Sequence, residues 1–159
     1  MPKLLLIFLL IAVACTTKET VTPGIPLELA EQRRNSIQDV VYDLSLDIPA
    51  SRKDNIQGII DITFTWKSNP ADLQIDFMPE KSSLKSIAVN GTPEKIRYAN
   101  EHILVAGGLL TEKTNTIRIE FIAGNAALNR NDDFLYSLFV PARASTCFPV
   151  FDQPDIKAI

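Results

Sequence analysis

Histidine is almost absent from this sequence, since His102 is the only one among 159 residues. A single histidine without a Glu-x-x-His neighbour or a cysteine pair does not complete a metal site. The chain also lacks a Gly-x-Ser-x-Gly nucleophile elbow and a glycine-rich phosphate loop. No catalytic or metal-binding residue is therefore predicted, and His102 is interpreted as a packed or polar structural side chain.

Runs of lysine or arginine are missing as well, and the net charge is −3, so no nucleic-acid partner is expected. Internal repeats and low-complexity tracts are also absent. Hydrophobic residues make up 46% of the chain and charged residues 22%, which is typical of a globular protein. The length predicts a single domain.

The long apolar run of the chain lies at its N-terminus, where Lys3 precedes the segment Leu4–Ala14. This run is too short to span a bilayer, which needs about 20 residues, and is typical of a secretory signal. Cys15 follows directly and resembles the lipobox cysteine of bacterial lipoproteins, which is acylated. We therefore expect a signal peptide over 1–14, a tether over 15–26 and a membrane anchor at Cys15 in the bacterial cell envelope, facing the periplasm or in the outer membrane. An ordinary cleaved signal is the alternative.

Only two cysteines are present, so lipid attachment at Cys15 leaves Cys147 without a mate. No disulfide is then expected in the exported domain. Cys147 is interpreted as a small buried apolar residue. Removal of the signal also takes away Lys3, so the net charge of the mature chain becomes −3 − 1 = −4.

Apolar and polar residues alternate with a period of two in four segments beyond Val40. This pattern is typical of half-buried strands, whose successive side chains point to opposite faces. The apolar positions are Tyr42, Leu44, Leu46 and Ile48, then Ile60, Ile62, Phe64 and Trp66, then Leu73, Ile75 and Phe77, and finally Ile117, Ile119 and Phe121.

Local signals complete the prediction of the fold. Asn90-Gly91 favours a tight hairpin turn, although the nearby Pro93 suggests a loop longer than two residues. Only the segment Leu27–Ile37 favours a short helix. We therefore expect an all-β fold, an antiparallel β-sandwich or open saddle, over residues 27–159.

Two polar features outside the strands are weak candidates for chemistry. Ser145 has no neighbouring base, because the one histidine is distant in sequence. Asp132 and Asp133 are adjacent, and adjacent side chains on a strand point apart, so a shared acid–base role is not expected. The two aspartates are interpreted as solvating a loop.

The segment Cys147–Ala158, "CFPVFDQPDIKA", combines two prolines, two phenylalanines and an aspartate. The prolines fix φ and hold the preceding residues extended. Asp152 is expected to cap the backbone amides that follow it. Phe148 and Phe151 each carry ~150–250 Å² of surface, which serves either to pack one domain against another or to close the sandwich core.

This segment resembles the Phe-Pro-x-Phe-Asp-x-Pro-x-x-Lys-Ala motif of the M1 family of zinc aminopeptidases, the aminopeptidase N-like enzymes. The matching positions are Phe148, Pro149, Phe151, Asp152, Pro154, Lys157 and Ala158. Upstream segments also resemble the family: "VVYDLSLDIP" its first strand, "IQGIIDITF" with Gly58 its second, and "DFLYSLFVPARAS" the approach to the motif. The resemblance covers about 120 residues.

The resemblance implies the β-rich N-terminal domain of an M1 enzyme, missing its last strands and therefore with an unpaired edge. The family's zinc site, His-Glu-x-x-His with a downstream Glu, belongs to the following catalytic domain and is not present here. The family's N-terminal domain also lends a Gln or Glu to the α-amine of peptide substrates, and the corresponding stretch "SLFVPARAS" contains neither.

The leading interpretation is thus a non-catalytic N-terminal domain, inactive alone, whose implied partners are the zinc-bearing catalytic domain and peptide substrates. Zinc is the cofactor of the full-length family enzyme and is not assigned to this chain. The alternative is a stand-alone, lipid-anchored β-sandwich of the cell envelope that binds a peptide or glycan without catalysis.

Overall fold

A computed structural model describes residues 21–67, 71–131 and 133–158. The predicted signal peptide over 1–14, the predicted lipid attachment at Cys15 and the side chain of Asp132 lie outside the described residues. Within the described ranges, no helix has both the length and the apolar character needed to cross a membrane.

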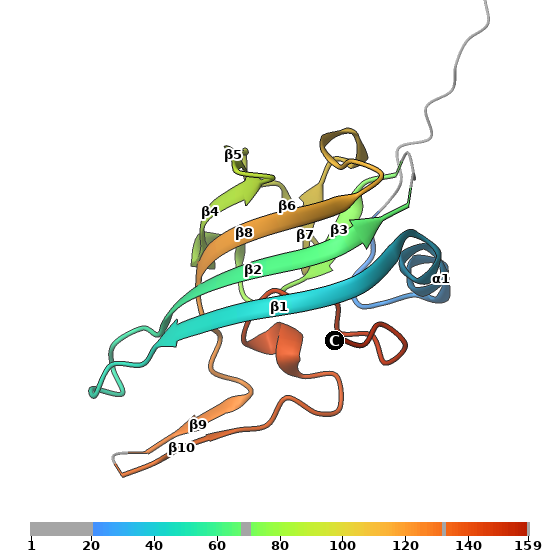
Figure 1. The fold of residues 1–159 in the computed structure, drawn as a ribbon. Coiled ribbons are helices and arrows are strands. Elements are labelled where there is room, and N and C mark those ends of the chain that lie inside the picture. The colour runs from blue at the N-terminus through green and yellow to red at the C-terminus, as the bar shows by residue number, and fades with distance from the viewer. Residues whose placement is uncertain (1–20, 68–70, 132, 159) are drawn as a thin grey trace, which may run out of the picture.

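A five-stranded antiparallel sheet forms one layer, with the strand order β1-β2-β8-β4-β5 (Figure 1). Its strands are β1 (Ile37–Asp47), β2 (Gln57–Trp66), β8 (Thr114–Ile122), β4 (Leu84–Val89) and β5 (Thr92–Pro93). On the interior strand β2, Ile60 and Ile62 are fully buried, and they pair in register with the equally buried Ile119 and Ile117 of β8. The alternation predicted for both segments is confirmed.

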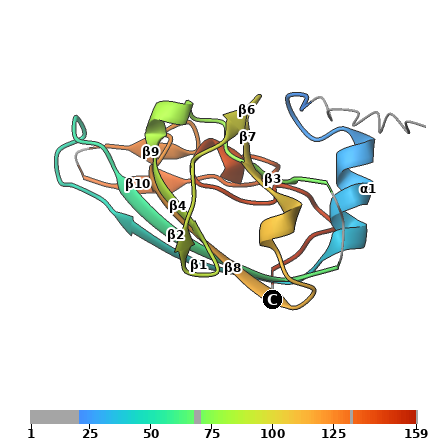
Figure 2. The same ribbon diagram turned by 90° about the horizontal axis from the view of Figure 1, so that it is seen from above.

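A three-stranded antiparallel sheet forms the second layer, with the order β3-β7-β6. Its strands are β3 (Leu73–Asp76), β7 (His102–Val105) and β6 (Tyr98–Ala99), and Figure 2 shows them on one side of the long strands. The ring of Phe77 meets the ring of Phe121 edge-on, with centroids 5.8 Å apart, so the two layers share one core. The predicted antiparallel β-sandwich is confirmed.

The two ends of the sandwich carry different elements. Helix α1 (Leu27–Ser36) lies at one end, and the hairpin of β9 (Leu128–Arg130) and β10 (Leu135–Ser137) lies at the other (Figures 1 and 2). The short helix predicted from the sequence is confirmed, and it ends where Ile37 turns extended to begin β1. Three 3-10 helices complete the described chain: η1 (Lys81–Ser83), η2 (Gly107–Leu109) and η3 (Ala144–Thr146).

The turn between β4 and β5 has two residues, because Val89 pairs directly with Thr92. Asn90 and Gly91 have φ angles of 50° and 80°, the left-handed values that this tight hairpin turn requires. The longer loop suggested by Pro93 is wrong. Pro93 belongs to the edge strand β5, where the sheet requires no hydrogen bond from its backbone nitrogen.

Candidate functional site

The motif segment runs between the two sheets and is held by its backbone. Val150 forms an isolated antiparallel bridge with Asp76 of β3, with N–O distances of 2.9 and 3.1 Å. The next amide, that of Phe151, donates a hydrogen bond of 2.9 Å to the hydroxyl of Tyr42 on β1. The segment therefore links the three-stranded sheet to the edge strand of the larger sheet.

The last part of the motif is more exposed. Pro154 and Lys157 lie at the surface, and Ala158 forms an isolated parallel bridge with Val40. Val40 lies where a register shift interrupts the pairing of β1 with β2. The end of the motif thus contacts the open edge of β1.

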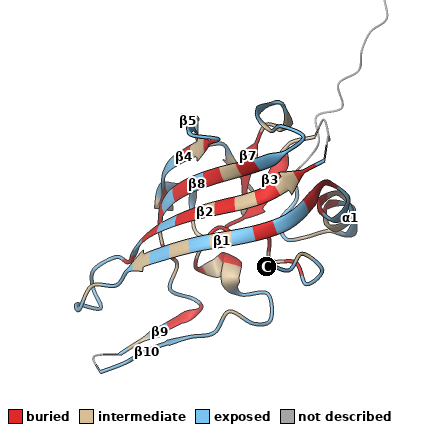
Figure 3. Cartoon of the chain, viewed as in Figure 1, coloured by how far each residue is buried: buried red, intermediate tan, exposed pale blue. Residues whose placement is uncertain are grey.

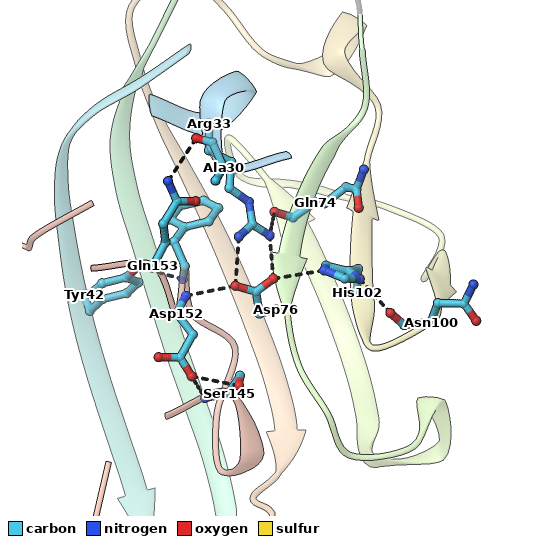
Figure 4. Close-up of polar contacts among 11 residues, drawn as sticks. Ala30, Arg33, Tyr42, Gln74, Asp76, Asn100, His102, Ser145, Asp152 and Gln153 are labelled. Carbon is cyan, nitrogen blue, oxygen red and sulfur yellow. Dashed lines mark hydrogen bonds and ion pairs between the residues drawn. The ribbon is translucent and has the colours of Figure 1, made fainter. Parts of the chain in front are cut away.

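Arg33 of α1 provides the central cation of this region, and only 2% of its surface is exposed. Its Nη1 lies 2.9 Å from Oδ2 of Asp76, and its Nη2 lies 2.5 Å from Oδ1 of the same carboxylate (Figure 4). Nη2 also donates to the carbonyl of Gln74, at 2.9 Å. Paired charge-assisted bonds of this kind are strong and directional, so they fix the helix against β3.

His102 of β7 contacts the other side of the same carboxylate. Its Nε2 lies 3.1 Å from Oδ1 of Asp76, and its Nδ1 lies 2.6 Å from the carbonyl oxygen of Asn100 (Figure 4). Both partners are hydrogen-bond acceptors, so each ring nitrogen of His102 is directed at an oxygen atom. With 1% of its surface exposed and both nitrogens engaged, His102 is the packed histidine that the sequence predicted.

Asp152 joins the motif to Asp76 and to η3. Its amide donates to Oδ2 of Asp76 at 2.9 Å, and its own Oδ2 accepts from the amide and the hydroxyl of Ser145, at 3.0 and 2.8 Å. The prediction that Asp152 caps the amides after it is wrong. Its side chain instead points back to η3, where it accepts hydrogen bonds from the amide and the hydroxyl of Ser145.

The two phenylalanines of the motif pack inside this domain. Phe151 is 3% exposed, and its ring meets Phe64 edge-on with centroids 6.1 Å apart. Phe148 is partly buried and meets Phe139, with centroids 5.3 Å apart. The sequence left two roles open for these phenylalanines, packing against another domain or closing the sandwich core. Phe151 therefore closes the sandwich core.

Gln153 continues these links to the helix. Its Nε2 donates to the carbonyl of Ala30 in α1, at 2.9 Å, and to the carboxylate of Asp155, at 2.7 Å. We call Arg33, Asp76, His102, Asp152 and Gln153 the polar cluster. It ties α1, β3, β7 and the motif to one another.

Within the polar cluster, burial and neighbouring charges have opposite effects on the pKa of a carboxyl group. Burial raises the pKa of the Asp76 carboxyl, but the hydrogen bonds from His102 and Arg33, the charge of Arg33 and the amide of Asp152 together bring it below its usual range. Burial raises the pKa of the Tyr42 hydroxyl, which therefore stays protonated beside the motif. Asp76 is the anion on which the cluster depends.

A cavity of about 320 Å³ opens beside the polar cluster. Its wall includes Asp76, His102, Ser145, Asp152 and Glu101. The hydroxyl of Ser145 faces Asp152, while the nitrogens of His102 face Asp76 and a backbone carbonyl. No nitrogen of His102 is therefore directed at the Ser145 hydroxyl.

The resemblance assigns the family's zinc centre to a following domain, and the described residues were compared with the requirements of such a centre. Across the parts of the chain that the structure describes, no three His, Cys, Asp or Glu side chains come together in a way that could hold a metal ion. Both nitrogens of His102 are already directed at oxygen atoms of Asp76 and Asn100.

Sequence reasoning missed Arg33, Asp76, Tyr42 and Gln153. A signal for Arg33 was present, because it lies four residues after the buried Leu29 on the same helix face. Asp76 carried no such signal. It alternates with the apolar Ile75, and this pattern predicts that its side chain faces solvent.

Comparison with solved structures finds the same fold in larger enzymes. Leukotriene A4 hydrolase from Saccharomyces cerevisiae is similar with a TM-score of 0.62 and 18% sequence identity, over 78% of this chain and 22% of that chain. An M1 zinc metallopeptidase from Deinococcus radiodurans is similar with a TM-score of 0.60 and 16% identity, over 77% of this chain and 31% of that chain. This chain thus spans less than a third of the length of either enzyme.

At these identities the likeness establishes the fold. The expected resemblance to the β-rich N-terminal domain of M1 peptidases is confirmed at that level. No protein-family model and no curated protein matches the sequence.

Proposed function

We propose that this chain is the N-terminal, non-catalytic domain of an M1-family zinc aminopeptidase, an enzyme that removes N-terminal amino acids from peptides. The proposal rests on one observation: the M1-like motif and the fold that M1 peptidases share occur in the same chain. The segment with the seven M1 motif positions is tied through Asp76 and Tyr42 into a sandwich that M1 zinc metallopeptidases share.

In this proposal the chain supplies structure and the zinc chemistry belongs to a further domain. The Asp76 carboxylate at the centre of the polar cluster contacts Arg33, His102 and the amide of Asp152, which suits a rigid support. The Deinococcus enzyme has been solved with a Tyr-Ser-Ala substrate, and a two-domain M1 zinc metallopeptidase has been solved with L-arginine. Peptides with a free N-terminus are accordingly the substrate class we propose for the complete enzyme.

Export and lipid anchoring at Cys15 form a separate part of the proposal. The apolar run before Cys15 and the polar segment after it support attachment to a membrane of the bacterial cell envelope. Partitioning into detergent should require the cysteine, so the Cys15→Ser variant should move to the aqueous phase. Equal partitioning of both forms would show that Cys15 carries no lipid.

The enzymatic part is tested by comparing two products of the same locus. One is the 159-residue chain, and the other is the chain extended by the reading frame that follows it. With added zinc, the extended protein should release product from aminoacyl anilides, and the chain alone should release none. Turnover by the chain alone would contradict the non-catalytic role.

A further inference from the structure

Asn90-Gly91 is the one place in the sequence where glycine follows asparagine. The two residues form the turn between β4 and β5, and both are exposed, as the colouring of this end of the sheet in Figure 3 also shows. Asparagine is chemically labile. A following glycine increases this lability, because no Cβ hinders the approach of its backbone nitrogen to the asparagine side chain. The turn is therefore a candidate site of spontaneous covalent modification.

Deamidation of such a pair has two steps. The backbone nitrogen of Gly91 attacks Cγ of Asn90 and loses its proton, so that an N–Cγ bond forms. The Cγ–Nδ2 bond breaks, and Nδ2 leaves as ammonia with that proton. Water then opens the cyclic imide at either carbonyl, which gives aspartate or isoaspartate. In the first step Cγ becomes tetrahedral, so Oδ1 and Nδ2 must both be free to move.

Three hydrogen bonds tie Asn90 to β8. Its backbone N–H donates to the carbonyl of Thr116 at 2.8 Å. Its Oδ1 accepts from the amide of Thr116 at 3.0 Å, and its Nδ2 donates to Oδ1 of Asn115 at 2.9 Å. Both side-chain atoms that must move during the reaction are thus engaged with β8. Since Asn90 itself is exposed, exclusion of water does not protect it.

Asn115 is held in one orientation, with 1% of its surface exposed. Its Nδ2 donates to the carbonyls of Thr111 and Lys113, at 2.9 and 2.8 Å. Two carbonyl partners require the donor end of the amide at this position, so the other end is the acceptor. That end, Oδ1, accepts from the amide of Thr111 at 2.9 Å and from Nδ2 of Asn90. The acceptor for Asn90 is therefore fixed in place by the backbone around the start of β8.

We propose that Asn90-Gly91 is a deamidation site that β8 keeps unreactive in the folded protein, with Asn115 as the positioning residue. The unfolded chain lacks these bonds, so Asn90 reacts there. An aspartate at position 90 offers no donor to Asn115 and places a carboxylate oxygen against its Oδ1. A chain modified while unfolded therefore refolds to a less stable protein. This inference does not depend on the proposed aminopeptidase function.

The rates of deamidation in the folded and the unfolded protein test the inference. The 159-residue chain is incubated in mildly alkaline buffer with and without urea, and mass spectrometry of its peptides measures aspartate and isoaspartate at position 90. The folded chain should react at least ~10-fold more slowly, because the reaction requires local opening of the turn. Equal rates in the two samples would contradict the proposal.

Two variants locate the protection. Asn115→Ala removes the acceptor of Asn90 Nδ2 and should raise the rate in the folded protein at least ~5-fold. Thr111→Val removes only a hydroxyl contact of 3.4 Å to Oδ1 of Asn115 and should leave the rate unchanged. Hydrogen exchange of the Ile60 and Ile119 amides reports whether the sheet stays closed. A faster reaction that appears only when these amides also exchange faster would assign the protection to the whole fold and overturn the role of Asn115.

Two readouts do not require Asn115→Ala to fold. In the wild type, the Nδ2 protons of Asn90 should exchange with solvent more slowly than in the unfolded chain, and equal exchange would overturn the proposal. Asn90→Asp reproduces one product and should unfold at a lower urea concentration than the wild type. Asn55→Asp, which makes the same change at an exposed position of the loop between β1 and β2, is the control and should leave the midpoint unchanged. Equal midpoints for both variants would show that the contact with Asn115 does not hold the turn.

Discussion

Arg33 and Asp76 lie 43 residues apart in the sequence and face one another through two parallel hydrogen bonds in the interior. Asp76 is also the acceptor for His102 and for the amide of Asp152. The Asp76 carboxylate thus connects helix α1, strands β3 and β7 of the three-stranded sheet, and the motif segment. The position of the motif depends on this ion pair.

Replacement of Arg33 by methionine should be strongly destabilising. The Arg33→Met variant leaves a buried carboxylate without its main partner, and breaking a buried pair in this way costs about 3–5 kcal/mol. The matched control is Arg34→Met, because Arg34 is the next residue of the same helix and is exposed. Urea unfolding of both variants measures the difference. Equal unfolding free energies would show that the pair contributes nothing.

Lowering the pH should reduce the unfolding free energy of the protein, because it protonates the carboxylate of Asp76. Its carboxyl has a pKa near 4 when unfolded and a lower pKa when folded. A group of this kind contributes stability that is complete above the unfolded pKa and is lost as the pH falls through the folded pKa. The unfolding free energy of the wild type should therefore decline below about pH 4 more steeply than that of Asp76→Asn.

The same prediction has a direct check that does not depend on the variant folding. An NMR titration of the Asp76 carboxyl in the wild-type protein should give a midpoint below the ordinary value of an aspartate carboxyl. A midpoint at or above the ordinary value would contradict the role assigned to Arg33 and His102.

Gly58 on β2 should not tolerate a methyl group. A Cβ at this position would lie within 3.0 Å of three ring atoms of Phe121, with which Gly58 is paired in register. Gly58→Ala should therefore cost about 1–3 kcal/mol through overpacking. Gly108→Ala is the control, because nothing lies within 4 Å of a Cβ there. Thermal unfolding of the two variants should differ by several degrees.

The thiol of Cys147 should be inert in the folded protein. It is fully buried, and burial raises its pKa to about 11, so little thiolate is present at pH 8. In the Cys15→Ser variant, a thiol reagent should label Cys147 only at the rate of unfolding. Fast labelling at pH 8 without denaturant would contradict the burial described here.

The strands could be predicted from the sequence because their burial has a local cause. Residues such as Ile60 and Ile62 alternate with polar neighbours, and one face of the sheet meets the core. The polar cluster could not be predicted in the same way. All four residues of β3 are buried, because the helix and the motif cover the face on which Asp76 lies.

The hairpin escaped prediction for a related reason. Leu135 and Tyr136 form a strand through pairing with Arg130 and Asn129, and both of their side chains are exposed, so no alternation marks β10. Asp152 shows the same dependence on distant residues. Its side chain is held by the amide and hydroxyl of Ser145, seven residues earlier, and this contact is not contained in local turn rules.

The most direct measurement of the central claim is the nucleotide sequence that follows the codon for Ile159 in the intact locus. We expect it to encode, in the same or a shifted frame, a domain with His-Glu-x-x-His and a downstream glutamate. That result would place the zinc ligands beside the motif-bearing sandwich described here. A stop codon followed by unrelated sequence, with no peptidase encoded, would contradict the assignment of this chain to an aminopeptidase.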